Sequence, residues 1–271
     1  MSPTSLLHLL NLASPALPVG AYSYSDGLEA LVARGAIATL PDLTDWLDRE
    51  LANGSIRLDA AIMVRAWQAT HDRDPARWLA WDRWLSAARE TEELREQSRQ
   101  MGRSLWRLLG DLLLTAEPVE PHHLVEPTGE IALIPPIDHA DRPDPTDRAQ
   151  KQALWQILDR SLREAASETT GPRCHFATAF GTAAALWQID RDEAILAYLH
   201  AWATNVINSG IKLIPLGQTD GQRVLQGIYG SIGQAATAID TLTDDNLEAW
   251  TWGLSLASMA HEVQYSRLFR S

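Results

Sequence analysis

The amino-acid sequence predicts an all-α protein, a single-domain bundle of about ten helices with one long proline-rich loop. Apolar residues recur at three- and four-residue spacing along almost the whole chain, and the alternation typical of strands is scarce. The length of 271 residues suits one large domain or two small ones. Apolar stripes of similar density lie on both sides of the proline-rich stretch, so we expect one domain over residues 1–271.

The helices are expected where the apolar period is strongest, and local chemistry marks several of their ends. Pro41 suits the first turn of a helix. Asp190 with Glu193, and Thr219 with Gln222, have the spacing of capping-box pairs. The expected helices are 25–35, 42–52, 55–70, 76–90, 92–115, 147–168, 175–188, 191–208, 220–240 and 244–265.

The helical period stops over residues 117–145, which hold half of the chain's 14 prolines. Proline lacks the backbone N–H group and blocks helix interiors, so this stretch is expected to be a long loop. Loops of this length usually have a function or are mobile. The loop histidines His122, His123 and His139 are interpreted as solvated, with weak chelation of a divalent ion as the alternative.

The charge balance excludes several classes of partner. With 23 Lys and Arg against 35 Asp and Glu, the net charge is −12, so no nucleic-acid partner is expected. Lys151 and Lys212 are the only lysines, too few for a polybasic patch that would bind anionic lipid. No segment reaches the roughly 20 apolar residues of a membrane span, so no membrane is expected either.

Cysteine content and the first residues indicate the compartment. Cys174 is the only cysteine, which excludes an internal disulfide framework and a CxxC metal clamp. Residues 1–5 lack the basic region of a secretory signal, and prolines interrupt the apolar run that follows. The sequence therefore predicts a cytoplasmic protein.

The sequence lacks the common nucleotide-binding motifs. No Gly-Lys pair exists, which excludes a phosphate-binding P-loop. Gly227, Gly230 and Gly233 are spaced three and three and follow no expected strand, unlike a dinucleotide fingerprint. Small residues on one helix face let another helix approach closely, so these glycines are candidates for a dimer seam.

No catalytic or metal site is expected from the sequence. His261-Glu262 begins like the zinc motif HExxH, but Tyr265 occupies the position of the second ligand, so His261 is interpreted as a packed or capping residue. Glu92 and Glu93 are interpreted, with Glu90, as a solvated helix face. A helical metal-dependent hydrolase and a purely structural homo-oligomer stay open as alternative functions.

Three short segments are not explained as plain helix. Residues 12–25 contain two prolines followed by Tyr22 and Tyr24, and residues 211–222 interrupt two strong helices with Pro-Leu-Gly. The segment 265–271 places Leu268 and Phe269 between two arginines. Aromatic residues and arginine concentrate at binding hot spots, so these segments are candidate contact surfaces.

Together these segments resemble motifs of the urease accessory protein UreF family, and the resemblance covers nearly the whole chain. The matching motifs, in their expected order, are Ser23-Tyr24-Ser25-Asp26-Gly27-Leu28-Glu29, Arg89-Glu90-Thr91-Glu92, Gln97-Ser98, Met101-Gly102, the stretch 175–181, Pro215-Leu216-Gly217-Gln218-Thr219-Asp220-Gly221-Gln222, and Tyr265-Ser266-Arg267-Leu268-Phe269-Arg270-Ser271. The family commonly has histidine where Asp26 stands here, and the proline-rich stretch looks longer than the usual connection.

The resemblance implies a function without catalysis. Members of the family are all-helical homodimers that bind the accessory protein UreD, called UreH in some organisms, and recruit the GTPase UreG. The complex delivers nickel to apo-urease. This implies that the chain binds no cofactor tightly, that nickel passes through the complex, and that the chain modulates the partner GTPase.

The resemblance also implies partner-binding residues. The tail, residues 265–271, is expected to be flexible and to order against UreD or UreG through Ser266, Arg267, Leu268, Phe269 and Arg270. Candidates for the surface that positions UreG are Lys212, Gln218, Asp220 and Gln222, with Arg223 aiding the GTPase through its charge. The remaining candidate partner-binding residues are Pro215, Leu216, Gly217, Thr219 and Tyr265, together with Tyr22 and Tyr24, which border the same face or the dimer seam.

Overall fold

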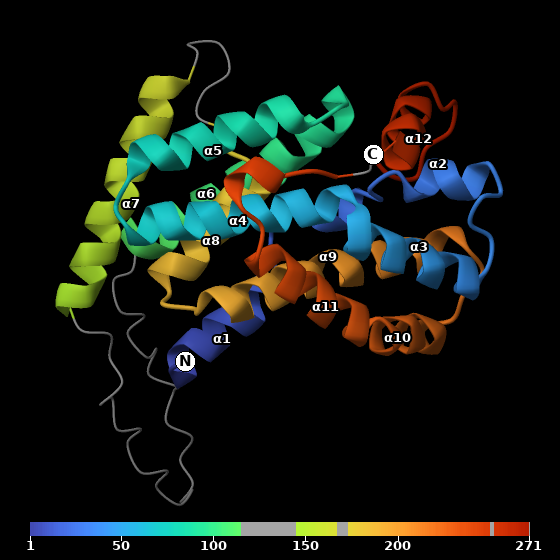
Figure 1. Ribbon diagram of the computed structural model, residues 1–271, viewed down its shortest axis with the longest axis horizontal. Helices are drawn as coiled ribbons and strands as arrows, with labels where there is room; N and C mark the ends of the chain where they lie inside the picture. Colours follow the sequence, from blue (N-terminus) through green and yellow to red (C-terminus); the bar gives the residue numbers. More distant parts are fainter. Residues whose placement is uncertain (115–144, 167–172, 250–251, 271) are drawn as a thin grey trace, which may run out of the picture.

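The computed structural model describes residues 1–114, 145–166, 173–249 and 252–270, and within these ranges the chain is helical and contains no strand (Figure 1). The α-helices are α1 (Pro3–Leu12), α2 (Leu28–Ala33), α3 (Leu40–Asn53), α4 (Ser55–His71), α5 (Pro75–Ala88), α6 (Glu92–Leu114), α7 (Pro145–Ala165), α8 (Phe176–Leu186), α9 (Arg191–Leu213), α10 (Gln218–Gly227), α11 (Tyr229–Asp240) and α12 (Trp252–Glu262). Two short 3-10 helices are η1 (Ala21–Ser23) and η3 (Asp244–Asn246). The all-α prediction is confirmed. The expected proline-rich loop lies, apart from Pro145, outside the described residues.

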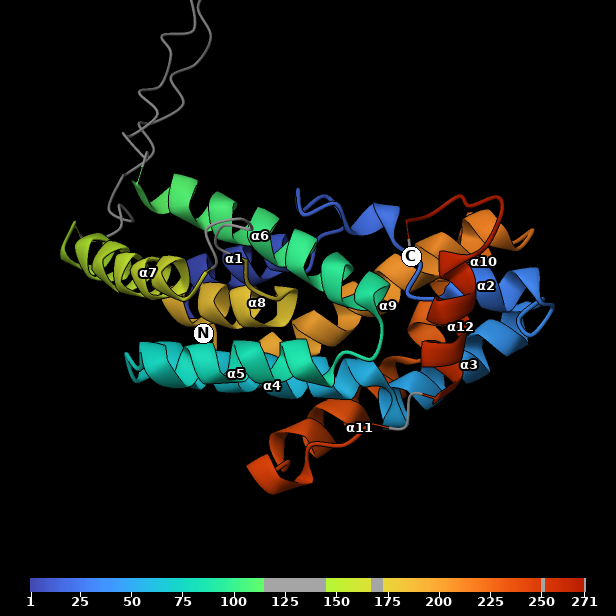
Figure 2. The ribbon, with the colours of Figure 1, turned by 90° about the horizontal axis from the view of Figure 1, so that it is seen from above.

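Helix α8 is the centre of the molecule. It lies between α4 and α5 on one side and α6 on the other (Figure 2). Its residues are mostly alanine, glycine and threonine, so neighbouring backbones approach closely. A Cβ atom added at Gly181 would lie 2.2 Å from the carbonyl oxygen of Met63 in α4, and one at Gly102 of α6 would lie 2.1 Å from the carbonyl oxygen of Cys174.

Three tryptophans pack the helices around α8 against one another. The rings of Trp78, Trp106 and Trp155 follow one another with centroid separations of 5.2 and 6.0 Å, which joins α5, α6 and α7. Trp78 donates from its indole nitrogen to the hydroxyl of Thr182 in α8 at 2.9 Å. Trp106 likewise donates from its indole nitrogen to Asp159 of α7 at 2.9 Å, and all three side chains are buried.

The opposite end is built from α2, α3, α10 and α12 around the second half of α9 (Figure 1). A capping box holds the start of α3, where Thr39 and Asp42 bond each other's backbone N–H groups. The last described residues come back to this end and lie beside α2 and α12 (Figures 1 and 2). No helix within the described ranges combines the length and the apolar character that crossing a membrane requires.

Several expected helix boundaries are wrong. The helix predicted over 220–240 is two helices, because the chain turns at the fully buried Ile228 between α10 and α11. The helix predicted over 244–265 starts only at Trp252. Before it, the chain is held against α4 by Arg65, which bonds the carbonyl of Leu242 at 3.1 Å and the carboxylate of Asp244 at 2.8 Å. Helix α1 was not expected.

Neither expected capping pair forms as the spacing indicated. Asp190 makes no side-chain cap on α9 and instead pairs with the amino group of Met1 at 3.5 Å. At α10 it is Asp220, not Gln222, that accepts a hydrogen bond from the backbone N–H of Gly217, at 3.3 Å. Sequence spacing alone could not distinguish these possibilities, because a long-range ion pair decides the first and a two-residue shift of the helix start decides the second.

Candidate functional site

The tail segment, residues 265–270, is docked on the body of the molecule at the end formed by α2, α9 and α12. The backbone N–H of Arg270 donates to the carbonyl oxygen of Ser23 at 2.9 Å. Next to it, Ser209 and Asn205 of α9 donate to the carbonyl oxygen of Tyr24 at 3.2 and 3.3 Å. Three segments that are far apart in the sequence therefore meet at one place.

One buried carboxylate holds the middle of the tail segment. Glu29 of α2 accepts the backbone N–H of Leu268 at 2.7 Å and that of Phe269 at 2.9 Å. The Phe269 side chain is only 6% exposed, and the ammonium of Lys212 lies 5.4 Å from the centre of its ring. The structure thus joins Lys212, from the second candidate segment, to Phe269 from the third through a cation–π contact.

Tyr24 continues this assembly into α6. Its hydroxyl donates to Gln100 at 2.7 Å, and Arg270 also approaches the phenol. Burial raises the pKa of the Tyr24 phenol, and the hydrogen bond and positive charge of Arg270 act in the opposite direction. Tyr24 is therefore a buried anchor of the tail segment, whereas its neighbour Tyr22 points into solvent.

Large apolar side chains remain exposed around the docked segment. Tyr22 is 71% exposed and Leu268 is 63% exposed, and Tyr265 is entirely exposed. Helix α12 adds Leu256 and Met259, which the helical period places on one face, and the exposed Val263 directly follows the helix. Exposed apolar residues in such numbers are typical of a surface that contacts another protein.

The corner between α9 and α10 is exposed as a whole. Pro215, Gly217, Gln218, Thr219, Gln222 and Arg223 are exposed, and Leu216 and Asp220 are half-buried. The Arg223 guanidinium pairs with the carboxylate of Asp220 at 2.8 Å, so its charge is partly neutralised. Of the candidate residues on this segment, Lys212 is the one whose contact with the tail segment is seen.

The three glycines proposed as a dimer seam belong to two different helices. Gly227 ends α10, and Gly230 and Gly233 lie in α11. Apart from the adjoining backbone of their own helices, no atom of the described residues lies within 4 Å of a Cβ added at any of them. The glycines do not serve helix packing inside this chain, and their role between two copies stays a prediction.

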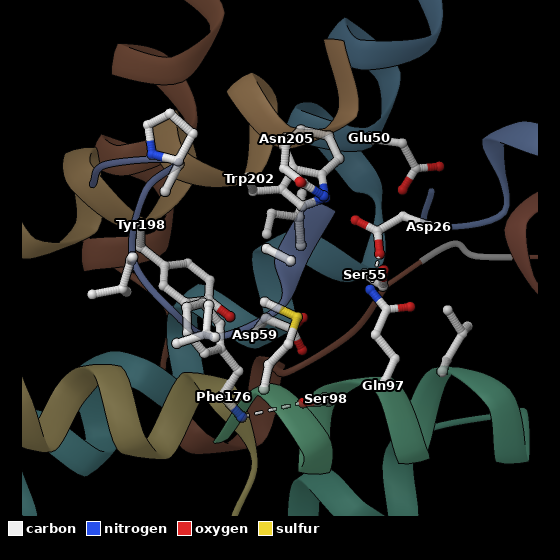
Figure 3. Close-up of a pocket in the computed structure, with 18 of the residues that line it drawn as sticks. Asp26, Glu50, Ser55, Asp59, Gln97, Ser98, Phe176, Tyr198, Trp202 and Asn205 are labelled. Atoms are coloured by element: carbon white, nitrogen blue, oxygen red, sulfur yellow. Dashed lines mark hydrogen bonds between the residues drawn. The ribbon is translucent and has the colours of Figure 1, made fainter. Parts of the chain in front are cut away.

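A cavity of about 100 Å3 lies in the interior behind this end, and no sequence motif indicated it. Three carboxylates line it: Asp26, Glu50 and Asp59. Figure 3 shows Asp26 and Glu50 on one side of the cavity and Tyr198 with Phe176 on the other. Loop residues between α1 and η1, among them Pro15, close part of the wall.

A tight turn places Asp26 in the cavity wall. Asp26 and Gly27 have positive φ angles of 52° and 76°, so the chain makes a left-handed turn just before α2. Glycine adopts this conformation easily, and a Cβ at Gly27 would also come within 2.9 Å of Leu254 in α12. The turn directs the Asp26 carboxylate at Gln97 of α6, which donates a hydrogen bond to it.

Burial dominates the electrostatics of the cavity. Removal from water raises the pKa of Asp26 and that of Asp59, although the Arg89 guanidinium bonds Asp59 and lowers its pKa in part. Burial, together with the charge of Asp26, raises the pKa of Glu50 to about 7. Glu50 therefore exchanges a proton in the physiological range.

Glu50 also separates the cavity from the surface. A second, more open hollow between α2, α3 and α12 shares Trp46, Glu50 and Leu254 with the cavity. Within the described residues, no group of three or more His, Cys, Asp or Glu side chains has the spacing to hold a metal ion. The arrangement can exchange protons or attract a cation at Glu50, and it does not form a closed coordination site.

Sequence reasoning missed the residues that hold α12 and the tail segment. His261 is fully buried, and its two ring nitrogens lie 2.7 Å from a Glu93 oxygen and 3.2 Å from a Glu29 oxygen. The interpretation of His261 as a packed residue is confirmed. That of Glu93 as solvated is wrong, because its side chain is only 10% exposed. The HExx spacing drew attention to His261 as a zinc ligand but could not indicate carboxylates 168 and 232 positions away.

Comparisons with known proteins agree with one another. A sequence model of the UreF family matches residues 37–229. The urease accessory protein UreF of Nostoc sp. is 47% identical over 265 residues, which cover 98% of this chain and 95% of the relative. The proteins of the same name from Synechocystis sp. and Thermosynechococcus vestitus are 42% and 39% identical over the full length of both chains.

Proposed function

The chain belongs to the urease accessory protein UreF family, and from this premise we propose that it is a non-catalytic scaffold for nickel insertion into urease. In this proposal it binds UreD, or UreH, with the docked tail segment and its surroundings, and it recruits the GTPase UreG with the exposed corner at residues 215–223. The assembly then acts on apo-urease. The chain modulates the GTPase by holding it in place, and performs no bond-making of its own.

The docked tail segment is the observation that supports the proposal most strongly. Its backbone is held by Glu29 and Ser23, and Phe269 is buried, while Leu268 and Tyr265 point outward. A segment held in this way presents apolar side chains on a preformed backbone. Binding such a segment costs a partner less conformational entropy than ordering a free one.

We treat nickel as cargo of the complex rather than a resident cofactor. The carboxylates of Asp26, Glu50 and Asp59 line the interior cavity, and Glu50 lies at its boundary with the surface hollow. Carboxylate oxygens attract divalent cations, and a route that holds its cargo too tightly would not release it. We therefore propose that these side chains favour the passage of nickel. The variant Glu50→Gln should lower the nickel content of urease and leave UreD binding unchanged.

Neither alternative function gains support from a specific contact. A metal-dependent hydrolase needs converging ligands, and the carboxylates of the cavity are joined there by no histidine or cysteine. A purely structural homo-oligomer would not need the docked tail segment. It is tested by sizing the purified chain with and without UreD and UreG, since a structural assembly would ignore both.

The direct test is co-purification of the chain with UreD. A chain ending at Tyr265 loses the contacts of Leu268, Phe269 and Arg270 and should no longer retain UreD. Its helix content by circular dichroism should stay unchanged, because the segment adds no helix. Retention of UreD by the shortened chain at the level of the intact chain would refute the proposal for the tail.

A matched pair of point variants distinguishes specific binding at the tail segment from nonspecific binding by exposed apolar side chains. Leu268→Ala and Leu7→Ala each remove one exposed leucine, 63% and 66% exposed, but Leu7 lies in α1 at the opposite end of the molecule (Figure 1). The proposal expects UreD binding to be at least about tenfold weaker for Leu268→Ala and unchanged for Leu7→Ala. Equal losses in both variants would contradict it.

A further inference from the structure

The interior cavity offers a small ligand one charged wall and one aromatic wall. Asp26 and Glu50 lie on one side of it, and Phe176 and Tyr198 lie on the other (Figure 3). Apolar side chains such as Val19 complete the lining. A molecule with a charged end and an apolar end would therefore contact both walls at once.

The charges of the lining favour a cation. The charged residues among those that line the cavity are Asp26, Glu50, Asp59 and Arg89, and Arg89 is already paired with Asp59 at 2.5 Å. Burial raises the pKa of all three carboxyl groups, because the neighbouring protein groups do not fully compensate for the loss of water. A positively charged occupant supplies that compensation, whereas an anion would add to the negative charge.

A hydroxyl group on the aromatic wall is an independent sign of a polar occupant. Tyr198 of α9 is only 4% exposed, and its phenol makes no hydrogen bond with any residue that the structure describes. Figure 3 shows its ring extending toward the other lining side chains. Burial raises the pKa of the phenol, so the hydroxyl keeps its proton. A buried hydroxyl without a hydrogen bond is costly, and an occupant that bonds to it removes that cost.

The volume limits the size of the occupant. The cavity measures about 100 Å3, and a protein cavity of roughly 150 Å3 holds benzene, so a molecule of about four or five non-hydrogen atoms is suitable. A bare metal ion would meet the carboxylates but leave the apolar part unfilled. The surface hollow shares Trp46, Glu50 and Leu254 with the cavity, so a cation that enters there meets the Glu50 carboxylate first.

We propose that the cavity is a binding site for a small primary alkylammonium ion of about four carbon atoms. Its ammonium group has three N–H donors, which bond the carboxylates of Asp26 and Glu50 and the phenol oxygen of Tyr198. Its alkyl chain packs against Phe176 and the Tyr198 ring, whose faces also attract a nearby positive charge. This site goes beyond the proposed function, which uses the same carboxylates only for the passage of nickel.

The test is isothermal titration calorimetry of the intact isolated chain with n-butylammonium chloride at pH 8, where Glu50 is mostly ionised. We expect saturable binding of one ion per chain with a dissociation constant of about 0.01–1 mM, a range open to a ligand of this size. The matched neutral probe is 1-butanol, which has the same shape without the charge and should bind at least about tenfold more weakly. Equal binding of 1-butanol, or no saturable binding of n-butylammonium up to about 10 mM, would overturn the proposal.

Variants locate the site. Glu50→Gln removes the charge at the entrance and should weaken n-butylammonium binding at least about tenfold. Tyr198→Phe removes only the hydroxyl and should weaken it about three- to tenfold. Glu262→Gln and Tyr22→Phe make the same two changes at exposed positions and should leave the dissociation constant unchanged. Equal losses in a variant and its control would contradict the site. Should a cavity variant fail to fold, the comparison of n-butylammonium with 1-butanol on the unaltered chain decides.

A separate arm concerns nickel, and only this arm rests on the proposed function. Saturating n-butylammonium should slow the activation of apo-urease by the chain together with UreD and UreG, because it occupies the carboxylates that favour nickel passage. Urease that already contains nickel is the control for direct inhibition. If the ion binds as expected but activation is unchanged, the binding site stands and the proposed passage of nickel through the cavity fails.

Discussion

Glu50 shows how burial, together with a neighbouring carboxylate, changes the chemistry of a carboxyl group. Its side chain lies at the wall of the cavity, near a second carboxylate at Asp26, and among the residues that the structure describes it forms no ion pair with a cation. Asp59, in the same cavity, differs because it bonds the Arg89 guanidinium. One carboxylate is therefore a proton-exchanging group and the other a member of an ion pair.

Replacing Glu50 by glutamine should stabilise the protein above neutral pH. The pKa of Glu50 is raised from 4.5 to about 7. At a pH between these two values, Glu50 is protonated in the folded state and ionised in the unfolded state. Stability from this group therefore falls as pH rises through that window. Relative to the unaltered chain, the free energy of unfolding of Glu50→Gln should be higher by about 1–3 kcal/mol at pH 8 and the same at pH 4, as measured by urea unfolding. Equal effects at both pH values would contradict this assignment.

Removing Arg89 should destabilise the fold strongly. Arg89→Met leaves the Asp59 carboxylate buried without its partner, which costs about 3–5 kcal/mol for a buried pair. The double variant Arg89→Met with Asp59→Asn should recover part of that loss, because no buried charge is then left uncompensated. Thermal unfolding of Arg89→Met, Asp59→Asn and the double variant gives the coupling energy, and an additive result would show that the pair is not a unit.

At the scale of elements, α8 explains much of the architecture. A helix of small residues allows α4 and α6 to approach its backbone, and Asp82 of α5 fixes its start by accepting the N–H of His175 at 2.8 Å and the hydroxyl of Thr178 at 2.6 Å. The apolar period predicted this helix almost to its ends. The choice of glycine over alanine at position 181 follows from a neighbour that only the folded structure reveals.

Gly181→Ala should be among the most damaging single-methyl changes in the chain. The new Cβ would meet backbone atoms of α4, at 2.2 Å from the Met63 oxygen and 2.9 Å from the Trp67 nitrogen, so the helices would have to separate. We expect a loss of at least about 2 kcal/mol. Gly233→Ala, in an open position of α11, should instead gain about 0.5–1 kcal/mol. Urea midpoints compare the two, and a loss at both positions would contradict the open environment of Gly233.

How much could be predicted from the sequence differs between elements and site. The periodicity found the helices of the core, because burial repeats every three to four residues. It failed at Ile228 and at residues 244–249, where burial in the core and contacts with Arg65, rather than local preference, decide the structure. The motifs identified the segments of Tyr24, Lys212 and Phe269, but not that they meet. The motifs also included Asp26 and Glu29, but the burial and partners of Glu29, Glu93 and the cavity carboxylates could not be predicted, since their environment comes from distant parts of the chain.

On the scale of the whole molecule, the glycines of α10 and α11 test the expected homodimer. Gly230 is exposed, and a Cβ added there meets no described atom beyond its own helix within 4 Å, so we expect Gly230→Leu to leave folding unaffected. If the glycines form the seam between two copies, the leucine holds the copies apart and sedimentation at micromolar concentration should shift to the monomer. An unchanged dimer with this substitution would exclude the seam.

Loss of the whole protein should leave urease present but without its metal. In a urease-positive host that lacks the gene, we expect normal amounts of urease protein with low activity and little nickel, because a scaffold affects assembly and not synthesis. Immunoblotting, activity and metal analysis of the purified urease measure the three quantities. Fully metallated urease in such cells would contradict the proposed function.

The meeting of Glu29 with Phe269 joins positions 240 residues apart. When a ribosome has synthesised only about the first nine tenths of the chain, the Glu29 carboxylate has not yet met the backbone N–H groups of Leu268 and Phe269. The docked backbone forms only after residue 270 has emerged. The tail segment can therefore dock only after the helical body has been synthesised. A polypeptide that lacks the tail segment cannot bind a partner through it.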